Sequence, residues 1–420
     1  MIRRLRHVAL DLSPLRDSRQ FRFLFIGQLI SLIGRQITVV AVPYQVYLLT
    51  HSSLRVGLLG LVQLVPFIFF SLVAGTIADQ VDRRRLLLLT QLLLAATSGL
   101  FVLGAIWGHP PLVYLYAVAA AAAGISAVDQ PARTATVPNL VSRAQLPSAV
   151  SLNFALFQLG TIAGPAVGGV VIARVGLPIA YVIDVVTFAA AIAAVLLLSP
   201  QVPIGRRPES PASALLAGFV FLKRTPVITG GYAADLIAMV LSMPRALFPA
   251  LALGLYHVGP SGLGLLYSAP GVGAVIGSMF SGFIAHVRNP GRVVIYAIAG
   301  WGLGITLFGL AASIWLAVLL LAFAGAADAI SAIARNTIQQ TLAPDRLRGR
   351  LSAVYSMVVV SGPYLGDARA GAVASVASAE FADVVGGITC LAGCLLVRLI
   401  FPQLWRYQAG RAADDPEPVS

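Results

Sequence analysis

The chain has 420 residues, of which 58% are hydrophobic and only 11% are charged, and its mean hydropathy is +0.88. Soluble domains carry about 25% charged residues, so this shortfall excludes an ordinary soluble enzyme. Two cysteines exclude a disulfide scaffold and a Cys-rich metal centre. The 40 glycines and 25 prolines are residues that membrane helices tolerate. Together these features predict an all-α integral membrane protein.

Twelve apolar runs follow one another along the chain, and most reach the ~20 residues that a helix needs to cross a bilayer. They are residues 21–48, 56–78, 86–106, 112–128, 148–172, 178–198, 226–250, 261–285, 293–312, 314–334, 350–373 and 382–401. No small-residue cleavage site follows the first run, so we expect it to remain as a helix. The sequence therefore predicts twelve transmembrane helices.

The net charge of +13 is distributed unevenly between alternate loops. Of the 29 Arg and Lys residues, 24 fall in the N-terminal segment, in the loops after the even-numbered spans and in the C-terminal tail. The positive-inside rule then places both termini in the cytoplasm, with the chain in the bacterial cytoplasmic (inner) membrane. The positive charge is therefore a topology signal, and we expect no nucleic-acid partner.

Short sequence matches recur between the two halves of the chain. Val-Gly-Leu-Leu at 56–59 returns 207 residues later as Leu-Gly-Leu-Leu at 263–266, and Gly164-Pro165-x-x-Gly168 returns at 362–366. Such a repeat predicts two pseudo-symmetric six-helix bundles in parallel orientation, an architecture of transporters. The expected parts are a cytoplasmic segment (1–20), a first bundle (21–198), a linker with an interfacial helix (199–225), a second bundle (226–401) and a cytoplasmic tail (402–420).

The loop after the second span carries the most specific motif, Gly75-Thr-Ile-Ala-Asp79-Gln-Val-Asp-Arg83-Arg84-Arg. It resembles motif A of the major facilitator superfamily, with departures at Gln80 and Asp82. A glycine allows close helix contact, and clustered arginines favour anionic headgroups. The resemblance implies that Asp79 belongs to a cytoplasmic gate. A purely topogenic basic loop is the alternative.

Further segments resemble one branch of this superfamily, which contains the enterobactin exporter and related secretion and drug-efflux proteins. They include Pro131-Ala-Arg133, Arg245-Ala-Leu-Phe-Pro249 and Pro344-x-x-x-Arg348-Gly-Arg350. The resemblance implies a secondary active exporter. Such a protein would move a small amphipathic molecule, siderophore-like or drug-like, by alternating access in exchange for protons. We expect it to act as a monomer in the lipid bilayer.

The fifth span contains Gly164, Pro165 and Gly168, which resemble a motif associated with proton-exchanging exporters. Proline removes a helix hydrogen bond, and the glycines allow a bend and close packing. The motif favours export, whereas a packing kink without directional meaning is the alternative. A secondary importer of a small organic solute, with the same fold, therefore stays open.

Ionisable residues inside spans are expensive in hydrocarbon and mark candidate functional sites. Gln28 and Arg35 lie on a polar stripe of the first span, expected to face a central cavity. Asp235 and Arg245 share one face of the seventh span, and Asp328 follows in the tenth. We expect Arg35 to bind an anionic cargo or a carboxylate, and an unpaired Asp235 near the midplane to couple protons, with Asp328 next in line. Structural salt bridges are the alternative.

The remaining ionisable residues have simpler expected roles. Asp129 with Arg133, and Asp328 with Arg335, are candidate gate latches or local ion pairs. Asp184 is expected to cap a helix near the outer interface, and Asp367 and Arg369 to point to different faces near the outer end of the eleventh span.

No nucleotide-binding loop, metal-ligand cluster or nucleophile triad is evident in the sequence. We therefore expect neither catalytic residues nor a bound metal or cofactor. A membrane-bound enzyme remains the third class of function after exporter and importer, and it would need a catalytic cluster at one interface.

Overall fold

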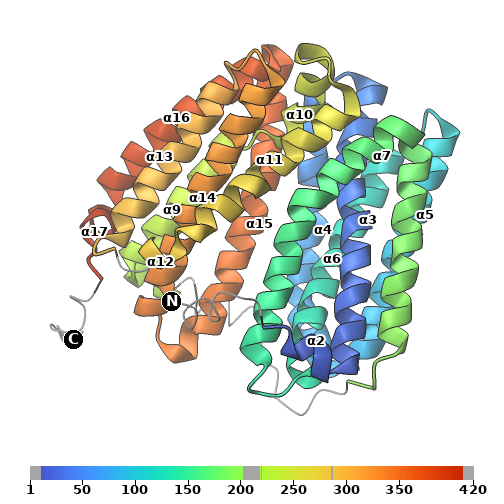
Figure 1. Cartoon of the computed structure of the whole chain (residues 1–420). Helices are drawn as coiled ribbons and strands as arrows, with labels where there is room; N and C mark the ends of the chain where they lie inside the picture. The colour runs from blue at the N-terminus through green and yellow to red at the C-terminus, as the bar shows by residue number, and fades with distance from the viewer. Residues whose placement is uncertain (1–10, 202–217, 219, 285–286, 410–420) are drawn as a thin grey trace, which may run out of the picture. The chain divides into compact units, whose positions relative to one another are not determined.

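The computed structural model describes residues 11–201, 218, 220–284 and 287–409. Eight side chains within helices, and the surroundings of Gly349, lie outside the description; the eight are those of Thr76, Ala78, Asp79, Asp345, Arg346, Arg348, Ser352 and Ala353. Because residues 202–217 and 219 are not described, most of the expected linker (199–225) with its interfacial helix falls outside the described residues. Every described element is helical (Figure 1), which confirms the all-α fold class.

The chain divides into two compact units. The first contains residues 1–45 and 62–211, and the second contains residues 46–61 and 212–420. The boundary between the units falls between residues 211 and 212, within the expected linker, and it also crosses the first two long helices. The helices up to residue 196 are α2 (Ser13–Asp17), α3 (Arg19–Thr50), α4 (Ser53–Gln80), α5 (Arg83–Trp107), α6 (Leu112–Leu140) and α7 (Leu146–Leu196).

Helix α7 contains the fifth and sixth expected spans. Its 51 residues would extend ~77 Å as a straight helix, more than twice the ~30 Å of a bilayer core. The backbone leaves helical geometry at Gly176, where φ is 80° and ψ is 175°. This left-handed φ suits glycine, and Pro178 follows it. The turn between the two spans is therefore a break at one residue.

The helices after residue 225 are α9 (Pro226–Ser242), η1 (Arg245–Leu247), α10 (Phe248–Ala250), η2 (Leu251–Leu255), α11 (Gly259–Met279), α12 (Ser281–Ile284), α13 (Pro290–Phe308), α14 (Ile314–Leu342), α15 (Asp345–Val376), α16 (Ala379–Ile400) and α17 (Pro402–Arg406). The seventh expected span is thus broken. Met243 adopts an extended conformation before Pro244, because a residue before proline avoids the α region.

Ten helical segments of the described chain are long and apolar enough to cross a membrane. This number counts α7 once, treats 226–255 as one segment and omits α15. Helix α15 has a low mean hydropathy because charged residues lie in its first turns and also farther along, at Asp367 and Arg369. Twelve spans result if α7 supplies two and α15 supplies one.

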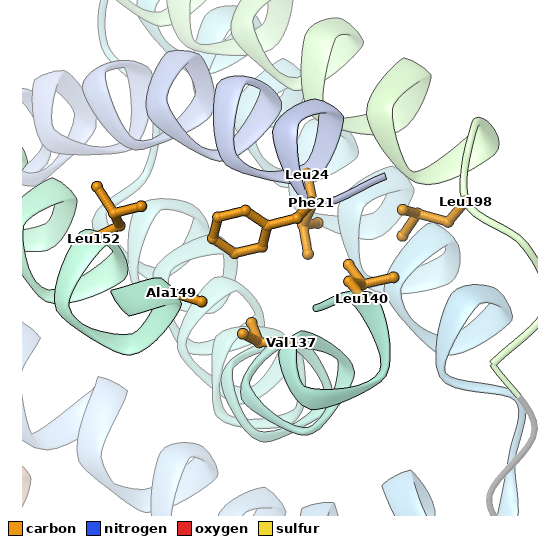
Figure 2. Packing of buried hydrophobic residues seen from close by; sticks show 7 residues of the cluster. All are labelled: Phe21, Leu24, Val137, Leu140, Ala149, Leu152 and Leu198. Carbon is orange, nitrogen blue, oxygen red and sulfur yellow. The ribbon is translucent and has the colours of Figure 1, made fainter. Parts of the chain in front are cut away.

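An apolar cluster holds the start of α3 against the ends of α6 and α7 in the first unit (Figure 2). Its members are Phe21, Leu24, Val137, Leu140, Ala149, Leu152 and Leu198, all buried. Ser18 fixes the entry of α3 into this cluster. Its hydroxyl donates to the Leu140 carbonyl (2.6 Å) and accepts from the Phe21 amide (3.1 Å), so it also caps the helix.

Small residues bring α11 and α14 together in the second unit. A Cβ atom added at Gly273 would overlap the carbonyl of Ala322 and lie 2.8 Å from the Ala326 nitrogen. One added at Gly277 would lie 3.0 Å from the Ala326 Cα. The two backbones approach this closely because no side chain separates them, as is common between membrane helices.

We predict that Gly273→Ala lowers the free energy of unfolding by about 1–3 kcal/mol, because the new methyl group overpacks a backbone contact. Thermal unfolding of the purified protein in detergent would measure the change. Gly99→Ala is the matched control, since a Cβ at Gly99 meets nothing within 4 Å. Equal melting temperatures for the two variants would contradict this account of the α11–α14 contact.

Candidate functional site

The buried carboxylate of Asp129 on α6 is fully hydrogen-bonded in the first unit. Its Oδ1 accepts from the Thr90 hydroxyl and the Gln91 amide of α5, each at 2.7 Å. Its Oδ2 accepts from the Arg133 guanidinium at 3.0 Å, one helical turn away. The expected local ion pair between Asp129 and Arg133 is therefore confirmed, and it anchors α5 to α6.

Asp184 on α7 lies against α3 and α5 and is only 1% exposed. Its Oδ2 accepts from the Thr38 hydroxyl (2.6 Å) and the Ser98 hydroxyl (2.8 Å). The expectation that Asp184 caps a helix near the interface is wrong, because the residue lies eight positions beyond Gly176 within the helical part of α7.

Arg35 on α3 interacts electrostatically with both Asp129 and Asp184. Among the described residues, no carboxylate lies within 4.0 Å of its guanidinium, and its buried Nε has no hydrogen-bond partner. Gln28, two turns earlier, is half-buried, and its backbone carbonyl accepts from the Ser31 hydroxyl at 3.3 Å. The polar side chains of the first span, which were expected to face a central cavity, thus point partly into the interior of their own unit.

The arginines after α4 bind the carboxyl-terminal ends of other helices in the first unit. Arg83 donates to the carbonyl of Ala135 (2.9 Å), and Arg84 donates to that of Leu196 (2.6 Å). Helix carboxyl ends carry partial negative charge, so both contacts are favourable. Asp82, which departs from the family motif, caps α5 by accepting from the Arg84 amide at 2.9 Å.

Two other expectations for this motif have different outcomes. The side chain of Asp79 lies outside the described residues. No described atom lies within 4 Å of the position that a Cβ of Gly75 would take, so no close helix contact is found there. Arg133, a further candidate for the gate, forms the ion pair with Asp129, and its role in gating stays a prediction.

The glycines of the fifth-span motif pack α7 against α3. A Cβ added at Gly164 would lie 2.8 Å from the Gln36 Cγ, and one at Gly168 would lie 3.0 Å from the Ile37 Cα. Pro165 lies inside the helix between them. The motif therefore supplies close helix packing, and its association with export stays a prediction.

A buried cluster in the second unit joins Asp235 of α9 to α14. The Arg335 guanidinium forms an ion pair with Asp235 and lies 3.8 Å from the Asp328 Oδ1. It also lies over the Tyr355 ring, 5.9 Å from its centroid. Asp235 was expected to be unpaired, and this is wrong because Arg335 on another helix neutralises it. Asp328 differs from Asp235 in that its side chain is 39% exposed.

A second ion pair holds the broken segment after α9. Arg245 pairs with the Asp367 carboxylate of α15 at 2.9 Å, and the Ala246 amide donates to the other oxygen at 3.2 Å. The Tyr267 hydroxyl donates to the Arg245 carbonyl at 3.2 Å. Asp367 is therefore buried and paired, whereas interfacial solvation was expected. Arg369 points elsewhere and donates to the Ala382 carbonyl at 3.3 Å.

The structure thus groups the predicted residues into pairs within each unit. Asp235 and Asp328 meet at Arg335, Arg245 meets Asp367, and Arg35 interacts electrostatically with Asp129 and Asp184 without an ion-pair contact among the described residues. The sequence patterns indicated only local or interfacial roles for Arg335, Asp367 and Asp184. The signal that could have identified them is that each is an ionisable residue in or next to an apolar run. Across the described residues, no three His, Cys, Asp or Glu side chains are grouped so that they could hold a metal ion.

Comparison with known proteins places this architecture in a family. The family model described as "Transmembrane secretion effector" matches residues 9–415. The enterobactin exporter EntS of Citrobacter koseri is 30% identical over 416 residues, which is 98% of this chain and 98% of that protein. EntS of Salmonella typhi is 30% identical over 406 residues, or 95% and 96% of the two chains.

Solved structures of membrane transporters share the fold. A bacterial homologue of the iron transporter ferroportin, in an inward-facing state, has a TM-score of 0.69 at 16% identity and covers 92% of this chain and 98% of its own. The nucleoside transporter NupG has a TM-score of 0.71 at 12% identity, with 93% and 100% covered. The chain is a multi-pass membrane protein of the transmembrane secretion effector family, within the major facilitator superfamily.

Proposed function

We propose that the protein is a secondary active exporter of a small amphipathic molecule, siderophore-like or drug-like. The observation that carries this proposal is the full-length similarity to proteins named enterobactin exporters, at 30% identity over 98% of the chain. The match covers the whole chain and not one unit of it. We propose the bacterial inner membrane as its location, with both termini in the cytoplasm and a monomer as the working unit.

We further propose that export proceeds by alternating access in exchange for protons. The Asp235–Arg335–Asp328 cluster supports this idea, because two carboxylates there share one guanidinium at unequal distances. Protonation of Asp235 would weaken its ion pair and release Arg335 toward Asp328. Asp328 is the more exposed of the two carboxylates, and we propose it as the group through which a proton enters the cluster. The buried charges would then favour one arrangement of helices in each protonation state.

The segment from Gly75 to Arg84 is proposed as part of a cytoplasmic gate. The contacts of Arg83 and Arg84 with the ends of α6 and α7 support this proposal, because they hold the end of this segment against other helices of the first unit. Arg35, which has no close carboxylate among the described residues, is proposed to face an anionic group of the cargo.

An importer of a small organic solute is the second candidate, and the direction of transport separates the two. Inverted membrane vesicles energised by a proton gradient should accumulate labelled enterobactin, or the dye ethidium, if the protein exports. Vesicles with Asp79→Asn should lose this accumulation while containing as much inserted protein. Uptake in right-side-out vesicles alone would instead establish an importer.

We predict that Asp235→Asn abolishes transport driven by a pH gradient but keeps exchange of labelled for unlabelled cargo across the vesicle membrane. The amide cannot bind and release a proton, whereas the cargo contacts elsewhere remain. Asp11→Asn, in the exposed segment before α2, is the matched control and should transport normally. Persistent gradient-driven transport in the Asp235→Asn protein would move the proton site to another residue, with Asp328 next.

We also predict that Arg245→Ala slows transport at least tenfold more than Arg369→Ala. Removing Arg245 leaves the buried Asp367 uncompensated, and breaking a buried pair on one side costs about 3–5 kcal/mol. Removing Arg369 costs one 3.3 Å hydrogen bond to a carbonyl and an electrostatic interaction with Asp383, but no ion pair within 4.0 Å among the described residues. Initial transport rates, normalised to the amount of folded protein, would measure the difference.

The double variant Arg245→Ala/Asp367→Ala separates stability from transport in this comparison. Without either charge, the melting temperature should recover from that of Arg245→Ala, while transport should stay slow. Equal and mild effects of Arg245→Ala and Arg369→Ala would show that neither side chain enters the transport path.

A further inference from the structure

Most buried aspartates of the described chain have a guanidinium close by. Asp129, Asp235 and Asp367 each have an arginine nitrogen within 4.0 Å, supplied by Arg133, Arg335 and Arg245. Asp184 and Asp383 are each only 1% exposed and have no cation within that distance among the described residues, and of the two Asp184 is the one whose carboxylate accepts from hydroxyl groups there. Its environment is therefore different in kind from that of the ion pairs.

The two carboxylate oxygens of Asp184 have unequal surroundings. Oδ2 lies between the hydroxyls of Thr38 and Ser98, at 2.6 and 2.8 Å. Oδ1 is enclosed and has no hydrogen-bond partner. Helix α3 closes this side, since a Cβ added at Gly34 would lie 2.7 Å from Oδ1. The neighbouring Tyr181 hydroxyl is already used, because it donates to Gln45 at 2.8 Å.

We propose that Asp184 is a proton-exchange site in the first unit, separate from the Asp235–Arg335–Asp328 cluster, and that the position of Arg35 controls its occupancy. An ionised carboxylate with an unsatisfied oxygen is costly away from water. The protonated acid fits the site, because a hydroxyl group can accept a hydrogen bond as well as donate one. The hydroxyl oxygen of Thr38 or of Ser98 can therefore accept a hydrogen bond from the carboxyl O–H.

The charges around Asp184 come from three helices. Arg35 acts on it electrostatically from α3, without an ion-pair contact. The Asp129–Arg133 pair lies on α6, and Tyr181 lies on α7 itself. Helix α5 contributes Ser98 and has no ionisable residue after Arg85. The Asp129–Arg133 pair is neutral as a whole, so Arg35 is the charge that favours ionised Asp184. A shift of Arg35 toward Asp184 would expel the proton, and a shift away would retain it.

Infrared difference spectroscopy of the purified full-length protein in lipid nanodiscs tests the site, with protons as the ligand. At neutral pH, the unsubstituted protein should show a carbonyl stretching band of a protonated carboxylic acid. Asp184→Asn should remove a component of this band that Asp383→Asn leaves in place, since the amide keeps the hydroxyl contacts but carries no acid, and Asp383 is the other buried aspartate without an ion pair among the described residues. Asp367→Asn is the matched control and should keep the band, because Asp367 is held as an ion pair by Arg245.

Arg35→Ala tests whether the arginine controls the proton. Without the cation, the pH at which the band is half lost should move upward, and Arg35→Lys should restore part of the change. A purely structural Arg35 would leave this midpoint in place. An unchanged midpoint in the Arg35→Ala protein would overturn the proposal. So would a spectrum that Asp184→Asn leaves unchanged at every pH at which the protein stays folded.

The link between this site and cargo movement rests on the proposed proton-coupled exporter, whereas the infrared measurement does not. If Asp184 binds a proton but vesicles show no proton-driven transport, the exporter proposal fails and the site stands. If transport is proton-driven and Asp184→Asn leaves the spectrum unchanged, the site fails and the exporter proposal stands.

Discussion

The cost of a charge in hydrocarbon is the constraint on which the interior of this protein depends. A charged side chain at the centre of a membrane helix is expensive, so it must find an opposite charge, a set of donors or water. Asp129 has Arg133 and two neutral donors, Asp235 has Arg335, and Asp367 has Arg245. Two of these pairs join helices that are distant in sequence, so each fixes tertiary structure as well as charge balance. Removing one partner would leave the other as an uncompensated buried charge, so substitutions at these positions should destabilise the fold.

Close backbone packing is the second requirement, because lipid tails give helices no hydrophobic reason to associate. Gly164 and Gly168 place α7 against α3, and Gly273 and Gly277 place α11 against α14. The same packing encloses the polar groups: Gly34 lets α3 approach closely enough to cover Asp184. Small residues therefore do more than hold helices together. By letting the helices pack closely they exclude water around a buried carboxylate, and the carboxylate then responds strongly to a nearby cation.

Each unit contains an arginine for which the carboxylates are unequal partners. In the second unit, Arg335 pairs with the buried Asp235 and lies farther from the more exposed Asp328. In the first, Arg35 interacts with Asp129, which is already satisfied, and with Asp184, which is not. A cation between unequal carboxylates is a suitable element for a switch, since one proton changes which partner it prefers. The proposed coupling of protons to transport uses this property in both units.

The sequence by itself determined the fold class and the family. Apolar runs longer than ~20 residues specify membrane helices because a bilayer demands that length, and the segment from Gly75 to Arg84 indicated the superfamily to which the chain belongs. It also predicted the pair of Asp129 with Arg133, since residues four apart share a helix face. Tertiary structure decided the pairs of Asp235 with Arg335 and of Arg245 with Asp367, whose members are 100 and 122 residues apart. Periodicity places a residue on a face of its own helix, but which helix meets that face depends on packing across the unit. For the same reason, the sequence assigned Asp184 to an interface, whereas the fold buries it between Thr38 and Ser98.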